Sequence, residues 1–127
     1  GGVGRAMNVL LDSCILIDFL SGREAAREYL GDIEGAAINR ITWMEVMVGA
    51  GSEDEEAVVR GFLSAFDVLP VDGPVAEEAV VLRRTRRMKL PDAIIFATAR
   101  VHGRSLATRN TRDFHEGEAG VSVPYRL

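Results

Sequence analysis

Four acidic side chains lie beside apolar segments, where a lone carboxylate is costly unless it caps a helix or meets a cation. They are Asp12 in VLLDS, Glu45 in TWMEVMV, Asp92 in KLPDAII and Asp113 in TRNTRDF. Clustered carboxylates repel one another unless cations separate them. Hard divalent ions such as Mg²⁺ or Mn²⁺ prefer oxygen ligands. Together the four acids therefore predict a divalent-metal site, provided that the fold brings them together.

Each acid also has a structural explanation when it is taken alone. Asp12 and Asp113 suit turns between elements, and Asp92 beside Pro91 suits the first turn of a helix. Glu45 shares a helical face with the apolar side chains of residues 41, 44 and 48, so it is expected either partly exposed or paired with an arginine.

Short apolar runs alternate with segments of helical pattern along the chain. The expected strands are residues 8–11, 36–38, 68–71, 105–108 and 121–123, and the expected helices are residues 14–20, 23–30, 41–48, 52–65, 74–88 and 91–102. This alternation predicts an α/β domain with a parallel central sheet of about five short strands flanked by helices. Ligands of such sheets bind beyond the carboxyl ends of the strands, so Asp12 and Asp113 are expected at one edge, with Asp92 nearby.

Length and composition indicate one globular domain. The chain has 127 residues, of which 47% are hydrophobic and 27% charged, and its formal net charge is −4. This charge excludes a generally basic nucleic-acid binder. Cys14 is the single cysteine, which favours a reducing, cytoplasmic setting, and we expect it to be a small core residue. No apolar run is long enough for a membrane helix. Residues 1–6 are typical of an expression-tag remnant, which leaves residues 7–127 as the domain.

Four segments resemble, in order and spacing, the acidic motifs of PIN-domain ribonucleases, and most of all those of the VapC toxins of toxin–antitoxin modules. The segments are VLLDSCILIDFL, TWMEVMVG, KLPDAIIFATA and LATRNTRDF. The resemblance implies a PIN fold in which Asp12, Glu45, Asp92 and Asp113 are catalytic, metal-binding acids. Asp113 is the acid whose direct contact with metal varies most among relatives. Supporting polar roles fall to Ser13, Thr108 and Asn110.

The same resemblance implies hydrolysis of RNA phosphodiester bonds with Mg²⁺ or Mn²⁺. One ion would activate a water molecule, a second would stabilise the leaving 3′ oxygen, and the products would carry 3′ hydroxyl and 5′ phosphate ends. The implied partners are an RNA substrate, a VapB-like antitoxin and a second copy of the chain in a homodimer, all in the cytoplasm. Ile15, Phe19 and Trp43 could serve the antitoxin tail or the dimer, although packing in the core explains each of them as well.

Basic residues gather just before Asp92 in the run RRTRRMK, and Arg109 and Arg112 flank Asn110. One explanation is a solvated helix face near a helix C-terminus. The other is a clamp for the RNA backbone that uses Arg86, Arg87, Arg109 and Arg112.

Other classes of protein were weighed against the ribonuclease. A response-regulator receiver needs an acid pair near the start and a late lysine, and a haloacid-dehalogenase-type phosphatase needs an aspartate where Cys14 stands; both are rejected. A catalytically inactive PIN scaffold that binds protein or RNA remains open, as does a PIN nuclease with a housekeeping role in RNA processing.

Overall fold

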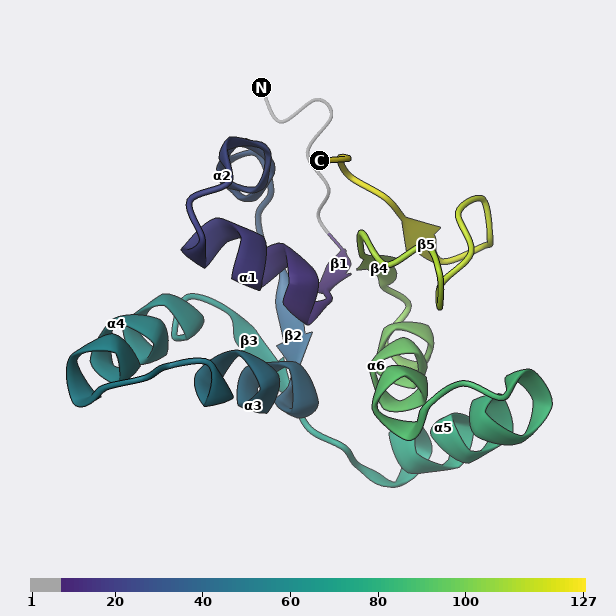
Figure 1. The fold of residues 1–127 in the computed structure, drawn as a ribbon. Coiled ribbons are helices and arrows are strands. Elements are labelled where there is room, and N and C mark those ends of the chain that lie inside the picture. Colours follow the sequence, from purple (N-terminus) through teal and green to yellow (C-terminus); the bar gives the residue numbers. More distant parts are fainter. Residues whose placement is uncertain (1–7) are drawn as a thin grey trace.

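The computed structural model describes residues 8–127, and the proposed tag remnant at residues 1–6 lies outside them. Five short strands form one parallel sheet in the order β3-β2-β1-β4-β5 (Figure 1). Their bounds are β1 Val9–Leu11, β2 Ala37–Asn39, β3 Asp67–Leu69, β4 Ser105–Ala107 and β5 Val121–Ser122. The predicted α/β fold with five parallel strands is therefore confirmed.

Six helices connect and cover the strands. They are α1 Ser13–Leu20, α2 Glu24–Gly31, α3 Arg40–Val48, α4 Glu53–Leu63, α5 Gly73–Arg86 and α6 Leu90–Val101. Among the described residues, none of these helices is long and apolar enough to cross a membrane.

Alternating side chains of the strands divide the core into two layers. Leu10 of β1 and Leu106 of β4 point toward α5 and α6, where Phe96 and Phe114 meet edge to face with ring centroids 5.7 Å apart. Leu11 points to the other side, toward Leu16 of α1 and the inner faces of α3 and α4. Helices on both faces of a parallel sheet leave its carboxyl edge as the open place for polar side chains.

Polar residues at that edge also start helices. Asp12 caps α1, and its Oδ1 accepts a hydrogen bond from the Ser13 backbone N–H at 2.9 Å. Asn39 ends β2 and caps α3, and its side-chain amide donates to Thr98 Oγ1 of α6 at 2.7 Å. Because this buried bond joins α3 to α6, it fixes the two helices that carry Glu45 and Asp92 relative to each other.

The end of α5 differs from the predicted boundary at residue 88. The helix ends at Arg86, and Arg87 adopts the left-handed conformation with φ of 55°. This turn directs Met88 into the core beneath α5 and α6. The buried side chain of Met88 therefore reaches the core from just beyond the helix cap rather than from the helix itself.

Candidate active site

The four predicted acids come from four separate elements and line one hollow of about 430 Å³. Asp12 caps α1, Glu45 lies on α3, Asp92 lies in the first turn of α6, and Asp113 follows β4. Ser13 and Asn110 line the same hollow, with Lys89 on its wall. We call it the carboxylate hollow. Asp12 and Asp113 follow parallel strands whose carboxyl ends meet at one edge of the sheet, and the middle of α3 and the first turn of α6 bring Glu45 and Asp92 to the same place.

Asp12 is the most deeply placed of the four acids. It is 5% exposed, and its Oδ2 accepts a 2.7 Å hydrogen bond from the hydroxyl of buried Thr108. Burial raises the pKa of Asp12, and the nearby charge of Asp113 adds to this, whereas the bonds from Thr108 and Ser13 oppose it. Because the hydrogen bonds do not fully offset burial, the charged form of Asp12 would be stabilised further by a cation in the hollow.

Glu45 lies on an exposed helix face, in agreement with the expectation that it is partly exposed. Met44 is 43% and Val48 is 83% exposed, while α3 turns Thr42 and Val46 inward. Of the apolar side chains at positions 41, 44 and 48, Ile41 packs against the core, whereas Met44 and Val48 face solvent. The pKa of Glu45 is nevertheless raised, first by the protein atoms around its carboxylate and then by the negative charges of Asp12 and Asp92, against a hydrogen bond from Ser13.

Asp92 and Asp113 complete the acidic wall. Burial raises the pKa of Asp92, as do the charges of Asp113 and Asp12, while Lys89 opposes the shift. Asp113 is held from one side, since the Asn110 side-chain amide donates to its Oδ2 at 2.8 Å. Each of the four acids therefore acts electrostatically on at least one other.

The donor set fits a hard divalent cation in kind. All four acids offer carboxylate oxygens, the ligands that Mg²⁺ and Mn²⁺ prefer. Within residues 8–127, however, no three Asp, Glu, His or Cys side chains lie close enough together to hold a metal ion as arranged. Binding would therefore require carboxylates on the walls of the hollow to turn toward one another.

Asp18 is a polar residue of this region that the sequence prediction missed. It is 6% exposed, and Arg109 donates two hydrogen bonds to it, from Nε to Oδ2 at 2.8 Å and from Nη2 to Oδ1 at 2.9 Å. The hydroxyl of Tyr125 donates to Oδ2 at 2.8 Å. The signal was present in SCILIDFL, where an acid interrupts an apolar helix and needs a buried cation.

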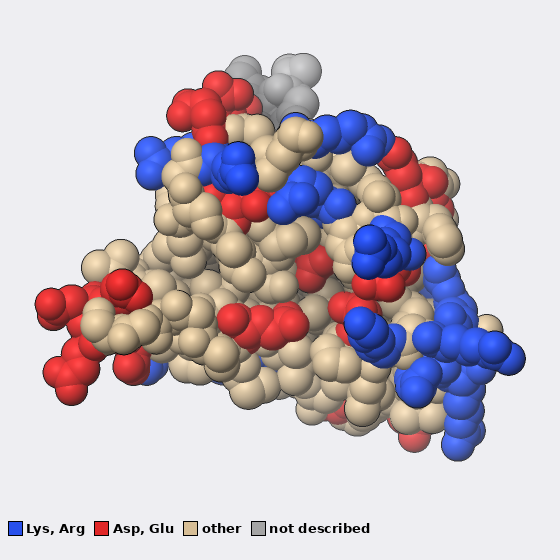
Figure 2. All heavy atoms as spheres, in the orientation of Figure 1, with Lys and Arg blue, Asp and Glu red and all other residues tan. Residues whose placement is uncertain are grey.

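The predicted RNA-binding arginines fall into two groups. Arg109 is engaged by Asp18, and Arg86 forms a two-point ion pair with Glu118 and lies over the Phe96 ring. Arg87 and Arg112 are exposed. Cations gather at the lower right of Figure 2 near α5, whereas acids gather at the left near α4. The exposed pair is therefore the one whose charge is available to a ligand.

Cys14 lies at the site rather than deep in the core, which corrects the sequence prediction. Its half-buried thiol is 3.7 Å from Asp12 Oδ2 and 3.7 Å from Thr108 Oγ1. Burial raises the pKa of this thiol, and the charge of Asp12 raises it further. The side chain is therefore a neutral packing group on the wall of the hollow.

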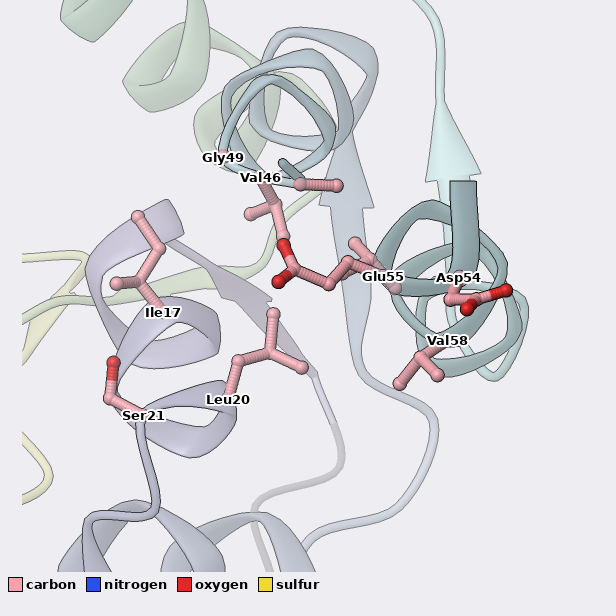
Figure 3. Close-up of a pocket in the computed structure, with 10 residues that line it drawn as sticks. Ile17, Leu20, Ser21, Val46, Gly49, Asp54, Glu55 and Val58 are labelled. Atoms are coloured by element: carbon pink, nitrogen blue, oxygen red, sulfur yellow. The ribbon is translucent and has the colours of Figure 1, made fainter. Parts of the chain in front are cut away.

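A separate apolar groove of about 490 Å³ runs between α1, α3 and α4 (Figure 3). Ile17, Leu20 and Val58 line it, and the Glu55 side chain extends from α4 toward α3, where its carboxylate accepts a hydrogen bond from the Gly51 backbone N–H at 2.7 Å. Val58 is 67% exposed. Among the residues named in advance for partner binding, Ile15 is fully buried, Phe19 stacks on Phe62 at 4.7 Å, and Trp43 lies under Arg40 and Arg60. The available apolar surface is thus formed by their neighbours.

Comparison with known proteins gives a consistent set of relatives. Residues 9–118 match the family described as the PIN domain. The chain is 32% identical over 119 residues to a protein of Shigella flexneri named tRNA(fMet)-specific endonuclease VapC, covering 85% of this chain and 90% of that protein.

Two solved structures have the same fold and more than a quarter of their residues in common with this chain. One is a toxin–antitoxin complex from Klebsiella pneumoniae, with 47% identity, a TM-score of 0.87, and coverage of 94% of this chain and 99% of the other. The second is DNA-bound VapBC from Salmonella typhimurium, with 28% identity, a TM-score of 0.72, and coverage of 91% and 95%.

Proposed function

The chain belongs to the PIN domain family, as its acidic motifs predicted, and from this membership we propose that it is the ribonuclease toxin of a toxin–antitoxin pair. The observation that carries the proposal is the carboxylate hollow, in which acids from four elements meet at the carboxyl edge of the sheet. The Shigella relative, described as a tRNA(fMet)-specific endonuclease, makes transfer RNA the first substrate to test.

PIN nucleases generally use divalent metals, and the side chains proposed to hold such an ion here, Mg²⁺ or Mn²⁺, are those of Asp12, Glu45, Asp92 and Asp113. A divalent ion bound by these carboxylates would supply an activated water and would offset negative charge that develops on the phosphate. Thr108 and the Ser13 backbone N–H hold the Asp12 carboxylate in place, and Asn110 holds that of Asp113. Support of this kind orients the carboxylates of Asp12 and Asp113, so the turning that metal binding requires is expected mainly of Glu45 and Asp92.

A protein antitoxin is the proposed partner, and the apolar groove between α1, α3 and α4 is its proposed docking surface. An amphipathic helix fits an apolar groove of this kind. The acids Asp54 and Glu55 among the lining residues favour a basic residue on that helix. Cytoplasmic location follows from the proposed RNA substrate, and a homodimer remains a proposal.

The experiment is incubation of the purified, antitoxin-free protein with transfer RNA and with total RNA in the presence of Mg²⁺ or Mn²⁺. EDTA and the variants Asp12→Asn and Asp92→Asn are the controls. Discrete cleavage that disappears in every control supports the proposal, and sequencing of the new ends identifies the target. Folded wild-type protein that bound neither ion would point instead to an inactive scaffold, while cleavage without growth inhibition in cells would point to RNA processing.

A further inference from the structure

A second polar hollow, of about 520 Å³, adjoins the carboxylate hollow. The two share the side chains of Cys14, Lys89, Asn110 and Asp113, so they form one continuous depression. Thr111, Arg112 and Arg109 complete the second hollow, which we call the basic hollow. Four acids line the carboxylate hollow, but of these only Asp113 also lines the basic hollow, so the balance of charge becomes more positive along the depression.

Two cations of the basic hollow lack an internal partner. Lys89 and Arg112 are exposed, and within the part of the chain that the structure describes neither forms an ion pair. Arg109 differs, because both arms of its guanidinium are bonded to Asp18. Lys89 lies close enough to act on the charge of Asp92, yet it does not pair with it. Lys89 and Arg112 are therefore the cations of the depression that are available to bind an anionic ligand.

The wall that carries Arg112 is firmly held. The backbone N–H of Asn110 donates to Thr108 Oγ1 at 3.0 Å, and that of Phe114 donates to the Asn110 carbonyl at 3.1 Å. The Phe114 ring is fully buried. Because Asp18 also anchors Arg109, the turn at residues 109–114 is fixed at both ends, and it presents Arg112 with little backbone freedom to lose on binding.

We propose that Lys89 and Arg112 bind an internal phosphate of the RNA strand, next to the phosphate that lies at the carboxylates. This proposal rests on the proposed ribonuclease function. Arginine binds phosphate through its planar fork, and lysine acts as a mobile point charge. A single strand that places one phosphate at the acids carries its neighbour along the depression, where the basic hollow meets it. The pair thereby sets the register of the strand over the acids.

The test measures binding of a single-stranded RNA oligonucleotide in EDTA, so that cleavage does not interfere, over a range of salt concentrations. Lys89→Gln and Arg112→Gln are compared with Arg27→Gln, which removes one exposed charge from α2. Each of the first two variants should weaken binding and reduce the salt slope, and the variant that carries both substitutions should reduce it by about 0.7, the value for one phosphate contact on a single strand. Arg27→Gln should match the wild type.

A second readout does not depend on RNA cleavage. Titration of the wild type with inorganic phosphate should move the backbone amide NMR signals of residues 110–112, and Lys89→Gln with Arg112→Gln should abolish this. Phosphate binding without cleavage of any RNA would retain the subsite and refute the ribonuclease. Two results together would overturn the subsite: both variants bind RNA with the affinity and salt slope of the wild type, and phosphate does not shift the amide signals. If the wild type still cleaved RNA, the ribonuclease function would stand.

Discussion

Asp18 of α1 and Arg109 after β4 form a two-point ion pair in which both carboxylate oxygens lie within 2.9 Å of guanidinium nitrogens. Tyr125 donates to the same carboxylate from the C-terminal segment. The pair thus joins the helix that begins at Asp12 to the turn that carries Asn110 and Asp113. Two parts of the carboxylate hollow that are far apart in sequence are held together by a residue that does not line it.

Asp18→Asn should reduce the free energy of unfolding by about 2 kcal/mol, since it removes the charge from two hydrogen bonds and leaves Arg109 unpaired. Arg109 is about a third exposed, so water recovers part of the loss. Urea unfolding monitored by circular dichroism measures the change. Asp32→Asn, at the exposed end of α2, is the matched control and should change stability little.

The Asp18 pair should also make stability depend on pH in the acid range. Burial alone would raise the pKa of Asp18, but the bonds from Arg109 and Tyr125 outweigh it and lower the pKa below its usual value. A lowered folded pKa contributes stability that is complete above the unfolded pKa of about 4 and is lost as pH falls through the folded pKa. The difference between wild type and Asp18→Asn should therefore shrink on acidification below pH ~4. A difference that grew on acidification would contradict this assignment.

The sequence predicted the sheet and the four acids because both depend on local pattern. Apolar runs followed by Asp12 or by Thr108 mark strand ends, and parallel strands bring their ends together. The sequence left open whether Glu45 is exposed or paired with an arginine, because Met44 and Val48 are apolar in a helix that buries only part of its circumference. The Asp18–Arg109 pair was missed because its residues are far apart in sequence, and no local pattern connects them.

Thr108 supports Asp12, so Thr108→Val should lower the cleavage rate while the protein stays folded. The hydroxyl donates to Asp12 Oδ2 at 2.7 Å and accepts from the Asn110 N–H at 3.0 Å, and valine replaces its shape without these bonds. Loss of a partner that orients a metal-binding carboxylate costs about 10- to 100-fold in activity or metal affinity. Cleavage rates and Mn²⁺ titrations check this, and Thr108→Ser should restore most of the loss. Full activity in the folded Thr108→Val variant would show that Thr108 is not needed to orient Asp12.

Divalent ions should stabilise the protein through the carboxylate hollow. The raised pKa values of Asp12, Glu45 and Asp92 show that burial and mutual repulsion oppose their charges, and a cation relieves both. Mn²⁺ at 100 times its Kd should add about 2.7 kcal/mol, which corresponds to a Tm increase of several degrees. Asp12→Asn should have a Tm in EDTA at least equal to that of the wild type, because one repelling charge is gone, and should respond little to Mn²⁺. An equal response from both proteins would place the ion elsewhere.

One charge placed in the apolar groove between α1, α3 and α4 should weaken binding of the antitoxin. Val58→Asp places a carboxylate among Ile17 and Leu20 and beside Glu55, where a docked apolar helix would have to desolvate it. Because Val58 is 67% exposed in the free chain, the variant should fold with nearly unchanged stability and cleave RNA as the wild type does. Affinity for the antitoxin should fall by at least about 10-fold, as expected when an anchor contact costs more than 1.4 kcal/mol. Val81→Asp on α5, also exposed, is the matched control. Calorimetric titration with the purified antitoxin decides the matter, and equal affinity of both variants would place the antitoxin on another face.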